Sequence, residues 1–311
     1  MPQIAVENPL WYTVPMKISI VVPCYNEADS LPHFKACFDK VAAQMPSIAF
    51  EVLLVNDGSK DETLSLCRKY EETDARICVL SFSRNFGKEA AIYAGLSHTT
   101  GELVAMLDAD LQDPPELLID MLRIMQETNC DCVAARRITR TGEPPIRSFF
   151  ARTFYKIMHG LSEVRVEDGV RDFRLMRREV VEAILSLPEK RRFSKGLMVW
   201  VGFDVQYIPY HNIERVAGET KFSFMGLFRY AIEGVTCLTS TPMRISYGLC
   251  AFCILAALLL CFLGCFLPAL LCAVTAFILL CIGAIGAYVA RIFWETKHRP
   301  LYVLRKHGKS M

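Results

Sequence analysis

Apolar runs rich in β-branched residues alternate with amphipathic stretches through the first half of the chain. The runs that read as buried strands lie at 18–23, 52–55, 77–82, 103–107 and 132–135. Apolar residues at helical spacing between them predict helices near 30–43, 61–72, 87–98 and 115–128. This alternation predicts an α/β domain with a mostly parallel sheet, in which ligands bind where the strands end.

The pattern becomes less regular after about residue 140. A helical pattern covers 145–161, the charged segment DGVRDFRLMRRE follows, and a strand is predicted at 204–209. Aromatic and basic residues at 222–241 indicate either an amphipathic helix at a membrane surface or a buried packing helix. The sequence leaves both interpretations open.

Two apolar segments, 245–266 and 269–290, follow and are separated by Pro268. Between Ile245 and Ile292 the only charged residue is Arg291. A helix of about 20 apolar residues crosses the roughly 30 Å of hydrocarbon in a bilayer. Because the connection around 264–268 is short, we expect a transmembrane helical hairpin whose ends emerge on the same side.

Basic residues flank this predicted hairpin. Arg244 precedes it, and those that follow it are Arg291, Lys297, Arg299, Arg305, Lys306 and Lys309. The excess of positive charge in cytoplasmic segments predicts that the preceding domain and both termini face the cytoplasm. The first residues, MPQIAVENPLWYTVPMK, lack the basic and apolar regions of a signal peptide, which agrees with that orientation.

Composition and charge narrow the functional classes. The net charge of +2 gives no reason to expect a nucleic-acid partner. The chain has 13 cysteines, and those outside the apolar segments show no C-x-x-C spacing, so we interpret them as small buried residues of a reducing compartment. The histidines show no metal-ligand spacing, which argues against a zinc site.

Polar clusters follow four of the predicted strands, namely PCYNE, NDGS, SRNFGK and DADLQD. No G-x-G-x-x-G and no P-loop follows any of these strands, so a different nucleotide-binding fold is needed. In DADLQDPPE, Asp108, Asp110 and Gln112 offer oxygen ligands that suit Mg²⁺ or Mn²⁺ beside a diphosphate. The same spacing also fits a turn or helix cap before Pro114 and Pro115, and that alternative stays open from spacing alone.

Seven strings occur in order along the chain, namely PCYNE, VNDGS, SRNFGKEAA, DADLQDPPE, VRDFRLMRR, ERVAGETKFS and RIFWETKHRPLY. Together they resemble the polyprenyl-phosphate glycosyltransferases. The resemblance covers about residues 17–303, and its enzymes are membrane-associated, inverting members of glycosyltransferase family 2 with the GT-A fold. It implies an α/β GT-A domain followed by the two-helix hairpin. The family often has four helices or a longer loop between two, whereas this chain has a short turn.

The resemblance also implies roles for individual residues. The expected nucleotide-binding residues are Pro23, Tyr25, Glu27, Asp57, Lys88 and Asp108. The D-x-D-x-Q residues Asp108, Asp110 and Gln112 would bind a divalent cation, Mg²⁺ or Mn²⁺. The expected catalytic and diphosphate-binding residues are Arg136, Asp172, Arg215 and Lys221. For Asp172 a base, an orienting group, a support for the metal site and a structural salt bridge with Arg171 or Arg174 all remain open.

The implied reaction is transfer of a hexose, most simply glucose from UDP-glucose, onto undecaprenyl or dolichyl phosphate at the cytoplasmic membrane face. A GDP-sugar is the alternative donor. A processive polysaccharide synthase is a rival interpretation, but the chain has no Q-x-x-R-W motif. A non-catalytic membrane scaffold or flippase accessory is the second rival.

These interpretations divide the chain into five regions. They are an N-terminal extension (1–16), a GT-A catalytic domain (17–221), a juxtamembrane amphipathic segment (222–244), the transmembrane hairpin (245–292) and a basic cytoplasmic tail (293–311). Small residues in the hairpin, Gly264, Gly283 and Gly286, could support a homo-oligomer, which is a further hypothesis.

Overall fold

The structure is a computed structural model, and it describes residues 16–138, 169–187, 189, 192–210 and 267–305. The strands are β1 (Lys17–Cys24), β2 (Ala49–Asn56), β3 (Ile77–Ser81), β4 (Leu103–Met106), β5 (Cys132–Arg137), β6 (Val170–Arg177) and β7 (Val205–Tyr210). The helices are α1 (Leu31–Gln44), α2 (Thr63–Thr73), α3 (Lys88–His98), α4 (Leu117–Thr128), α6 (Arg178–Ser186), α7 (Ser194–Trp200) and α10 (Leu267–Thr296). The helices and strands expected within these residues are confirmed to within about two residues at most ends.

Within the described residues, seven strands form one sheet in the order β3-β2-β1-β4-β6-β5-β7. The pairs β1–β2, β2–β3, β1–β4 and β5–β7 are parallel. Strand β6 lies between β4 and β5 and is antiparallel to both. The sheet is therefore mixed.

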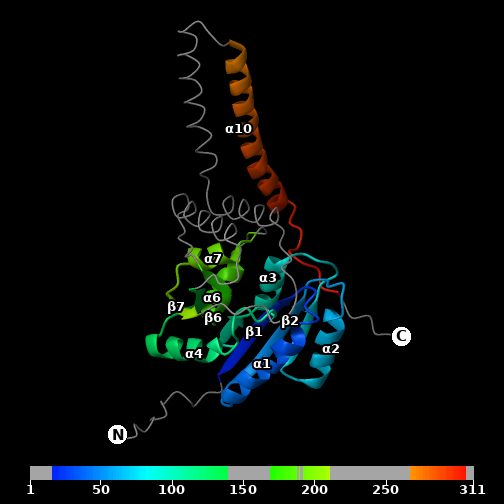
Figure 1. Cartoon of the computed structure of the whole chain (residues 1–311), viewed down its shortest axis with the longest axis vertical. Helices are drawn as coiled ribbons and strands as arrows, with labels where there is room; N and C mark the ends of the chain where they lie inside the picture. Colours follow the sequence, from blue (N-terminus) through cyan, green and yellow to red (C-terminus); the bar gives the residue numbers. More distant parts are fainter. Residues whose placement is uncertain (1–15, 139–168, 188, 190–191, 211–266, 306–311) are drawn as a thin grey trace, which may run out of the picture.

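Helices cover both faces of the sheet, which explains the nearly continuous apolar strands (Figure 1). Ile20 and Val22 of β1 pack on the face covered by α1, α2 and α4. Val21, between them, points to the opposite face, where α3 and α6 pack. Gly95 of α3 allows this close packing, because a Cβ there would lie 2.2 Å from Cγ1 of Val21.

Strand β6 corrects the sequence interpretation. Its sequence, VRDFRLMR, was interpreted as a charged segment because arginine and aspartate interrupt the apolar residues. Phe173 and Leu175 are nevertheless fully buried on one face, and Met176 is buried on the other. The charged residues are tolerated in a central strand because they find partners at the sheet edge described below.

Helix α10 contains the second predicted apolar segment and continues to Thr296 (Figure 1). Among the described residues it is the one helix long and apolar enough to cross a membrane, with a mean hydropathy of 2.3 over Ala273–Ala290. At about 1.5 Å per residue, its 30 residues measure about 45 Å. The first predicted segment, 245–266, lies outside the described residues, as do the helix at 145–161 and the juxtamembrane segment.

Candidate active site

The candidate site lies at the edge of the sheet where β1, β2, β3, β4 and β5 end. Strand β6 runs the other way, so it begins at this edge. In its pairing with β4, Met106 lies opposite Arg174. Extending this antiparallel register by two residues beyond β4 brings Asp108 toward Asp172, and both carboxylates contact the ammonium group of Lys88. The fold thus brings together two carboxylates that are far apart in the sequence.

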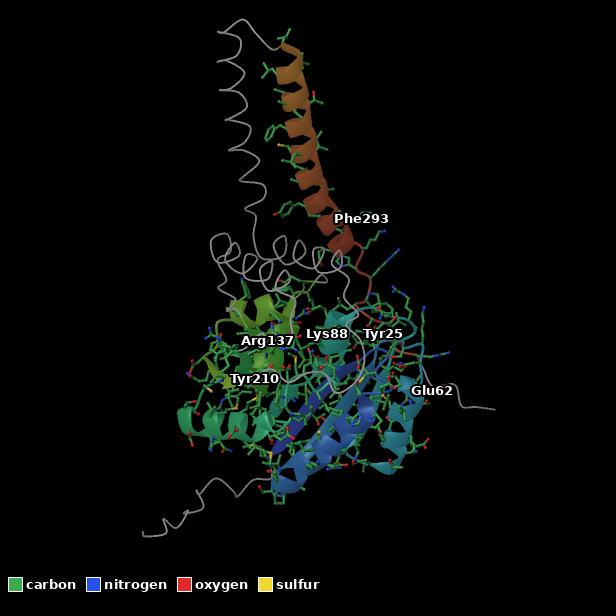
Figure 2. The ribbon with its side chains drawn as sticks, viewed as in Figure 1. Tyr25, Glu62, Lys88, Arg137, Tyr210 and Phe293 are labelled. Atoms are coloured by element: carbon green, nitrogen blue, oxygen red, sulfur yellow. The ribbon has the colours of Figure 1, made fainter. Side chains whose placement is uncertain are left out.

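Lys88, the first residue of α3, joins these two carboxylates. Its Nζ lies 2.7 Å from Oδ1 of Asp108 and 2.6 Å from Oδ2 of Asp172. Figure 2 shows Lys88 in the part of the domain nearer to α10. Burial alone would lower the pKa of Lys88, but Asp108 and Asp172 raise it above its ordinary value. Lys88 is therefore a fixed positive charge between the predicted metal ligand and the predicted catalytic aspartate.

The charge state of Asp172 follows from this contact. Burial alone would raise the pKa of Asp172, but Lys88 and Lys195 hold it well below its ordinary range. An ionised carboxylate of low pKa is a poor proton acceptor. Among the described residues, Asp172 forms no salt bridge with Arg171 or Arg174, which was one of the alternatives left open for it. Arg171 instead pairs with Asp113, and Arg174 donates to the backbone oxygens of Arg171 and Asp172.

Asp110 shapes the loop that carries the predicted metal ligands. Its Oδ1 accepts a hydrogen bond from the backbone N–H of Gln112, 3.2 Å away, and Leu111 between them has a positive φ of 55°. The helix-cap alternative for this loop is wrong. Helix α4 has Glu116 as its N-cap residue, and it has no side-chain cap hydrogen bond.

A buried cluster orients the side chain of Gln112. The Oε1 atom of Gln112 accepts a hydrogen bond from Arg171, 3.0 Å away. The Nε of Arg171 also donates to Oδ1 of Asp113 at 3.0 Å, and the hydroxyl of Tyr210 donates to that same oxygen. Asp113 is only 1% exposed, so its charge depends on these partners. Burial raises the pKa of Tyr210 above its ordinary value, and Asp113 raises it further.

The oxygen ligands of this loop fit a hard divalent cation. Asp108, Asp110 and Gln112 offer two carboxylates and an amide, and Mg²⁺ is commonly held by one or two carboxylates with substrate phosphates completing its shell. Within the described part of the chain, no group of three or more His, Cys, Asp or Glu residues could hold a metal by itself. A cation here would therefore need further oxygen ligands, such as those of a diphosphate.

The loop after β1 and the turn after β2 hold each other in place. Ser59 Oγ accepts from the backbone N–H of Asn26 at 3.0 Å, and Oδ1 of Asn26 accepts from the N–H of Lys60 at 2.8 Å. Thr63 Oγ1 accepts from the N–H of Glu27 at 2.8 Å. The predicted nucleotide-binding residues Pro23, Tyr25 and Glu27 lie on this braced segment.

Asp57, at the end of β2, holds the loop between β3 and α3. Its carboxylate accepts hydrogen bonds from the N–H groups of Phe86 at 2.6 Å and Gly87 at 2.9 Å. Burial raises the pKa of Asp57, while these hydrogen bonds oppose the rise. The next residue, Gly58, has a φ of +63°, and a Cβ there would lie 2.3 Å from the carbonyl carbon of Arg84. The contact of Asp57 with a nucleoside remains a prediction.

Arg136 and Arg137 end β5 at the same edge of the sheet. The pairing with β6 shifts register between Ala134 and Arg136, and such bulges redirect side chains. The backbone N–H of Arg137 donates to the oxygen of Gly169 at 2.9 Å, and this contact brings the start of β6 to the end of β5. Arg136 is exposed and lies within β5 rather than just past it, and its contact with a diphosphate remains a prediction.

Sequence reasoning did not identify α7 as part of the site. Glu89, next to Lys88, accepts hydrogen bonds from the backbone N–H and the hydroxyl of Ser194. Lys195 donates to the backbone oxygen of Val170 at 3.0 Å and adds positive charge near Asp172. Asp113 and Tyr210 were also missed, although Asp113 directly follows D-x-D-x-Q. Arg215 and Lys221 lie outside the described residues.

Comparison with known proteins identifies the family. The sequence profile "Glycosyl transferase family 2" matches residues 19–185. The chain is 38% identical to the bactoprenol glucosyl transferase of Shigella phage SfV, over 95% of this chain and 100% of that one. It is 36% identical to the prophage bactoprenol glucosyl transferase homolog of Escherichia coli K12, over 94% of this chain and 100% of that one. An uncharacterized glycosyltransferase of Synechocystis, sll0501, is 36% identical over 93% of this chain and 95% of that one.

The family profile covers β1 to β6 and the D-x-D loop. The chain belongs to glycosyl transferase family 2, and it is a glycosyltransferase with an α/β GT-A fold.

Proposed function

We propose that this glycosyltransferase transfers a hexose, most simply glucose from UDP-glucose, onto a polyprenyl phosphate. The observation that carries the proposal is the convergence of Asp108, Asp172 and Lys88 at the sheet edge. Carboxylates there can hold a divalent cation, and that cation and the lysine can offset the negative charge of a diphosphate. The names of two relatives, one a bactoprenol glucosyl transferase and the other a homolog of that enzyme, support the sugar and the lipid. Undecaprenyl or dolichyl phosphate would be the acceptor.

The reaction is a single displacement. An oxygen of the lipid phosphate forms a bond to the anomeric carbon, the bond between that carbon and the β-phosphate oxygen of the donor breaks, and UDP leaves with the electron pair. This displacement inverts the anomeric centre. A phosphate monoester has its second pKa near about 6, so the nucleophile is already anionic and needs no strong base. The ionised Asp172 therefore orients the acceptor or the basic groups around it.

Asp108, Asp110 and Gln112 would hold Mg²⁺ or Mn²⁺, which supplies positive charge for the leaving diphosphate. Lys88 and Arg136 place further positive charge at the same edge. Such preorganised charges act where negative charge develops in the transition state. Pro23, Tyr25, Glu27 and Asp57 would frame the nucleoside, and Arg215 and Lys221 would close over the diphosphate.

The apolar helix α10 supports a membrane location for this reaction. As a transmembrane span it would anchor the domain beside a lipid-borne acceptor. The paired segment 245–266 would complete the hairpin and leave both termini and the catalytic domain in the cytoplasm. Anchoring confines the enzyme and its acceptor to one surface, which raises their effective concentration.

The test is a product assay with the full-length protein in detergent. Undecaprenyl phosphate, Mn²⁺ and a panel of UDP- and GDP-sugars are supplied, and lipid-linked product is detected by mass. We expect one hexose per lipid from UDP-glucose, lost with a chelator and in Asp110→Ala. Asp120→Ala is the matched control, because Asp120 is an aspartate on α4 that pairs with Arg123, away from the D-x-D loop.

Other outcomes would overturn parts of the proposal. Product from a different donor would replace glucose as the sugar. A product carrying a chain of sugars would favour a processive synthase. Nucleotide binding without product from any donor would favour a non-catalytic scaffold. Activity that survives a chelator would remove the divalent cation from the mechanism.

A further inference from the structure

The segment that follows α10 returns to the catalytic domain (Figure 1). Leu304 forms an antiparallel bridge with Phe82, just after the end of β3. The backbone N–H of Ser83 donates to the oxygen of Val303 at 2.9 Å, and the N–H of Arg305 donates to the oxygen of Ser81 at 2.7 Å. These bonds attach residues 303–305 alongside the end of β3, which is the outermost strand on that side of the sheet. We call residues 301–305 the return segment.

An aromatic contact reinforces this docking. The ring of Tyr302 stacks on the ring of Phe82, with centroids 5.0 Å apart and planes 16° apart. Phe82 is only 2% exposed and also meets the ring of Phe86 edge-on, with centroids 5.7 Å apart. Three aromatic rings therefore connect the return segment with the loop between β3 and α3.

That loop leads directly into the candidate site. It contains residues 82–87, and it is held by the return segment at Ser83 and by Asp57 at Phe86 and Gly87. The next residue is Lys88, which contacts Asp108 and Asp172. The side chains of Ser83, Arg84 and Asn85 are exposed, so these backbone contacts, together with the close packing of Gly58 against Arg84, fix the course of the loop. The position of the loop should therefore depend both on the return segment and on Asp57.

We propose that the return segment is a positioning element for the donor site, and that it links the apolar helix α10 to the loop that presents Phe86, Gly87 and Lys88. When the segment is docked, this loop is fixed and the nucleotide donor binds tightly. When it is displaced, the loop and Lys88 shift and donor binding weakens. This proposal rests on the proposed function in one respect, because it takes the end of the sheet that carries Lys88 as the nucleotide-binding site.

Two pairs of variants separate the contacts. Tyr302→Ala removes the stacked ring, whereas Tyr302→Phe keeps it. Arg305→Pro removes the N–H that donates to Ser81, whereas Arg305→Ala keeps that N–H and changes only an exposed side chain. Each full-length variant is titrated with UDP, and with GDP, by calorimetry in detergent. Thermal unfolding and the KM values for donor and lipid are measured on the same samples.

We expect Tyr302→Ala and Arg305→Pro to weaken nucleotide binding about 3- to 10-fold, in line with the loss of one aromatic pair or one hydrogen bond. The KM for the donor should rise while the KM for the lipid stays within about twofold. Tyr302→Phe and Arg305→Ala should bind like the wild type.

Lower thermal stability with unchanged nucleotide binding would overturn the proposal, because the segment would then be only a structural attachment. A rise in the KM for the lipid alone would overturn it as well. Failure of the proposed function alone gives a different result. The wild type would then bind UDP but make no lipid-linked sugar, and the UDP affinities of the variants could still be compared with that of the wild type. A wild type that binds neither nucleotide overturns both.

Discussion

Asp172 bonds to the ammonium group of Lys88 at 2.6 Å, although the two residues are 84 positions apart in the sequence. The antiparallel entry of β6 beside β4 makes this contact possible, because it brings Asp172 to the end of the sheet where Asp108 follows β4. The same ammonium meets both carboxylates. In the absence of Lys88, two negative charges would face each other at the place where the proposed donor would bring its own negative charge.

Replacing Lys88 should therefore affect activity strongly. We expect Lys88→Met to lower kcat/KM by about 10²- to 10³-fold, the range for loss of one preorganised electrostatic group. Lys88→Arg should keep part of the activity because it keeps the charge. Lys69→Met, on the exposed surface of α2, is the control and should behave like the wild type. Steady-state kinetics with purified variants measure the effect, and a loss below about threefold would exclude an electrostatic role.

The buried pair of Asp113 and Arg171 should dominate local stability. Asp113→Asn leaves the Arg171 charge without its partner, and loss of one member of a buried pair costs about 3 kcal/mol or more. Tyr210→Phe removes only the hydroxyl donor and should cost about 1 kcal/mol. Denaturant unfolding of the two variants checks this order. Equal unfolding midpoints for Asp113→Asn and the wild type would contradict it.

Stability should fall in acid partly through Glu51. Burial alone would raise the pKa of Glu51, but hydrogen bonds from Ser19, Thr100 and Lys17 outweigh it and lower the pKa from 4.5 to about 2. A carboxylate whose pKa is lower in the folded protein than in the unfolded protein stabilises the folded state at pH values above its unfolded-state pKa. This contribution is lost as the pH falls through the folded-state pKa.

The stability difference between the wild type and Glu51→Gln should therefore be constant near neutral pH and shrink between about pH 4.5 and 2. Unfolding free energies measured across this range provide the test. A difference that does not change with pH would show that the hydrogen bonds of Glu51 do not depend on its charge.

Gly58 and Gly202 form a matched pair for testing the turn after β2. Both have positive φ, +63° and +77°, so alanine strains the backbone at either position. At Gly58 the new Cβ would also lie 2.3 Å from the backbone of Arg84, whereas at Gly202 nothing lies within 4 Å. Gly58→Ala should lower the melting temperature more than Gly202→Ala and should also weaken UDP binding. Equal effects would mean that the contact with the loop after β3 is not tight.

Much of this architecture could be predicted because it depends on local patterns. The apolar runs of β1 to β5 and the helices between them follow spacing that a single sequence carries. Strand β6 could not be found in this way, since its charges are neutralised by residues far away, such as Asp113 and Lys88. Tertiary contacts thus override the local pattern of a charged segment.

The residues of the candidate site divide in the same way, into those that a local motif identifies and those that only the fold brings together. The D-x-D-x-Q residues were recognised from their motif, but the hydrogen bond between Gln112 and Arg171 joins positions 59 apart. Of the alternatives left open for Asp172, the salt bridge with Arg171 fails for a geometric reason, because adjacent residues of a strand point to opposite faces. Arg174 lies on the same face as Asp172, but it donates to the backbone oxygens of Arg171 and Asp172. Lys88 reaches Asp108 and Asp172 because α3 begins at the end of the sheet where these two carboxylates lie.

The central claim is that a lipid phosphate attacks the donor directly in one active site. The most direct test is the anomeric configuration of the lipid-linked sugar, determined by NMR on product made from α-linked UDP-glucose by the purified protein. A single displacement predicts the β-linked glucosyl phosphate and no other anomer. An α-linked product would contradict the account, because it would require two displacements or a different route of attack.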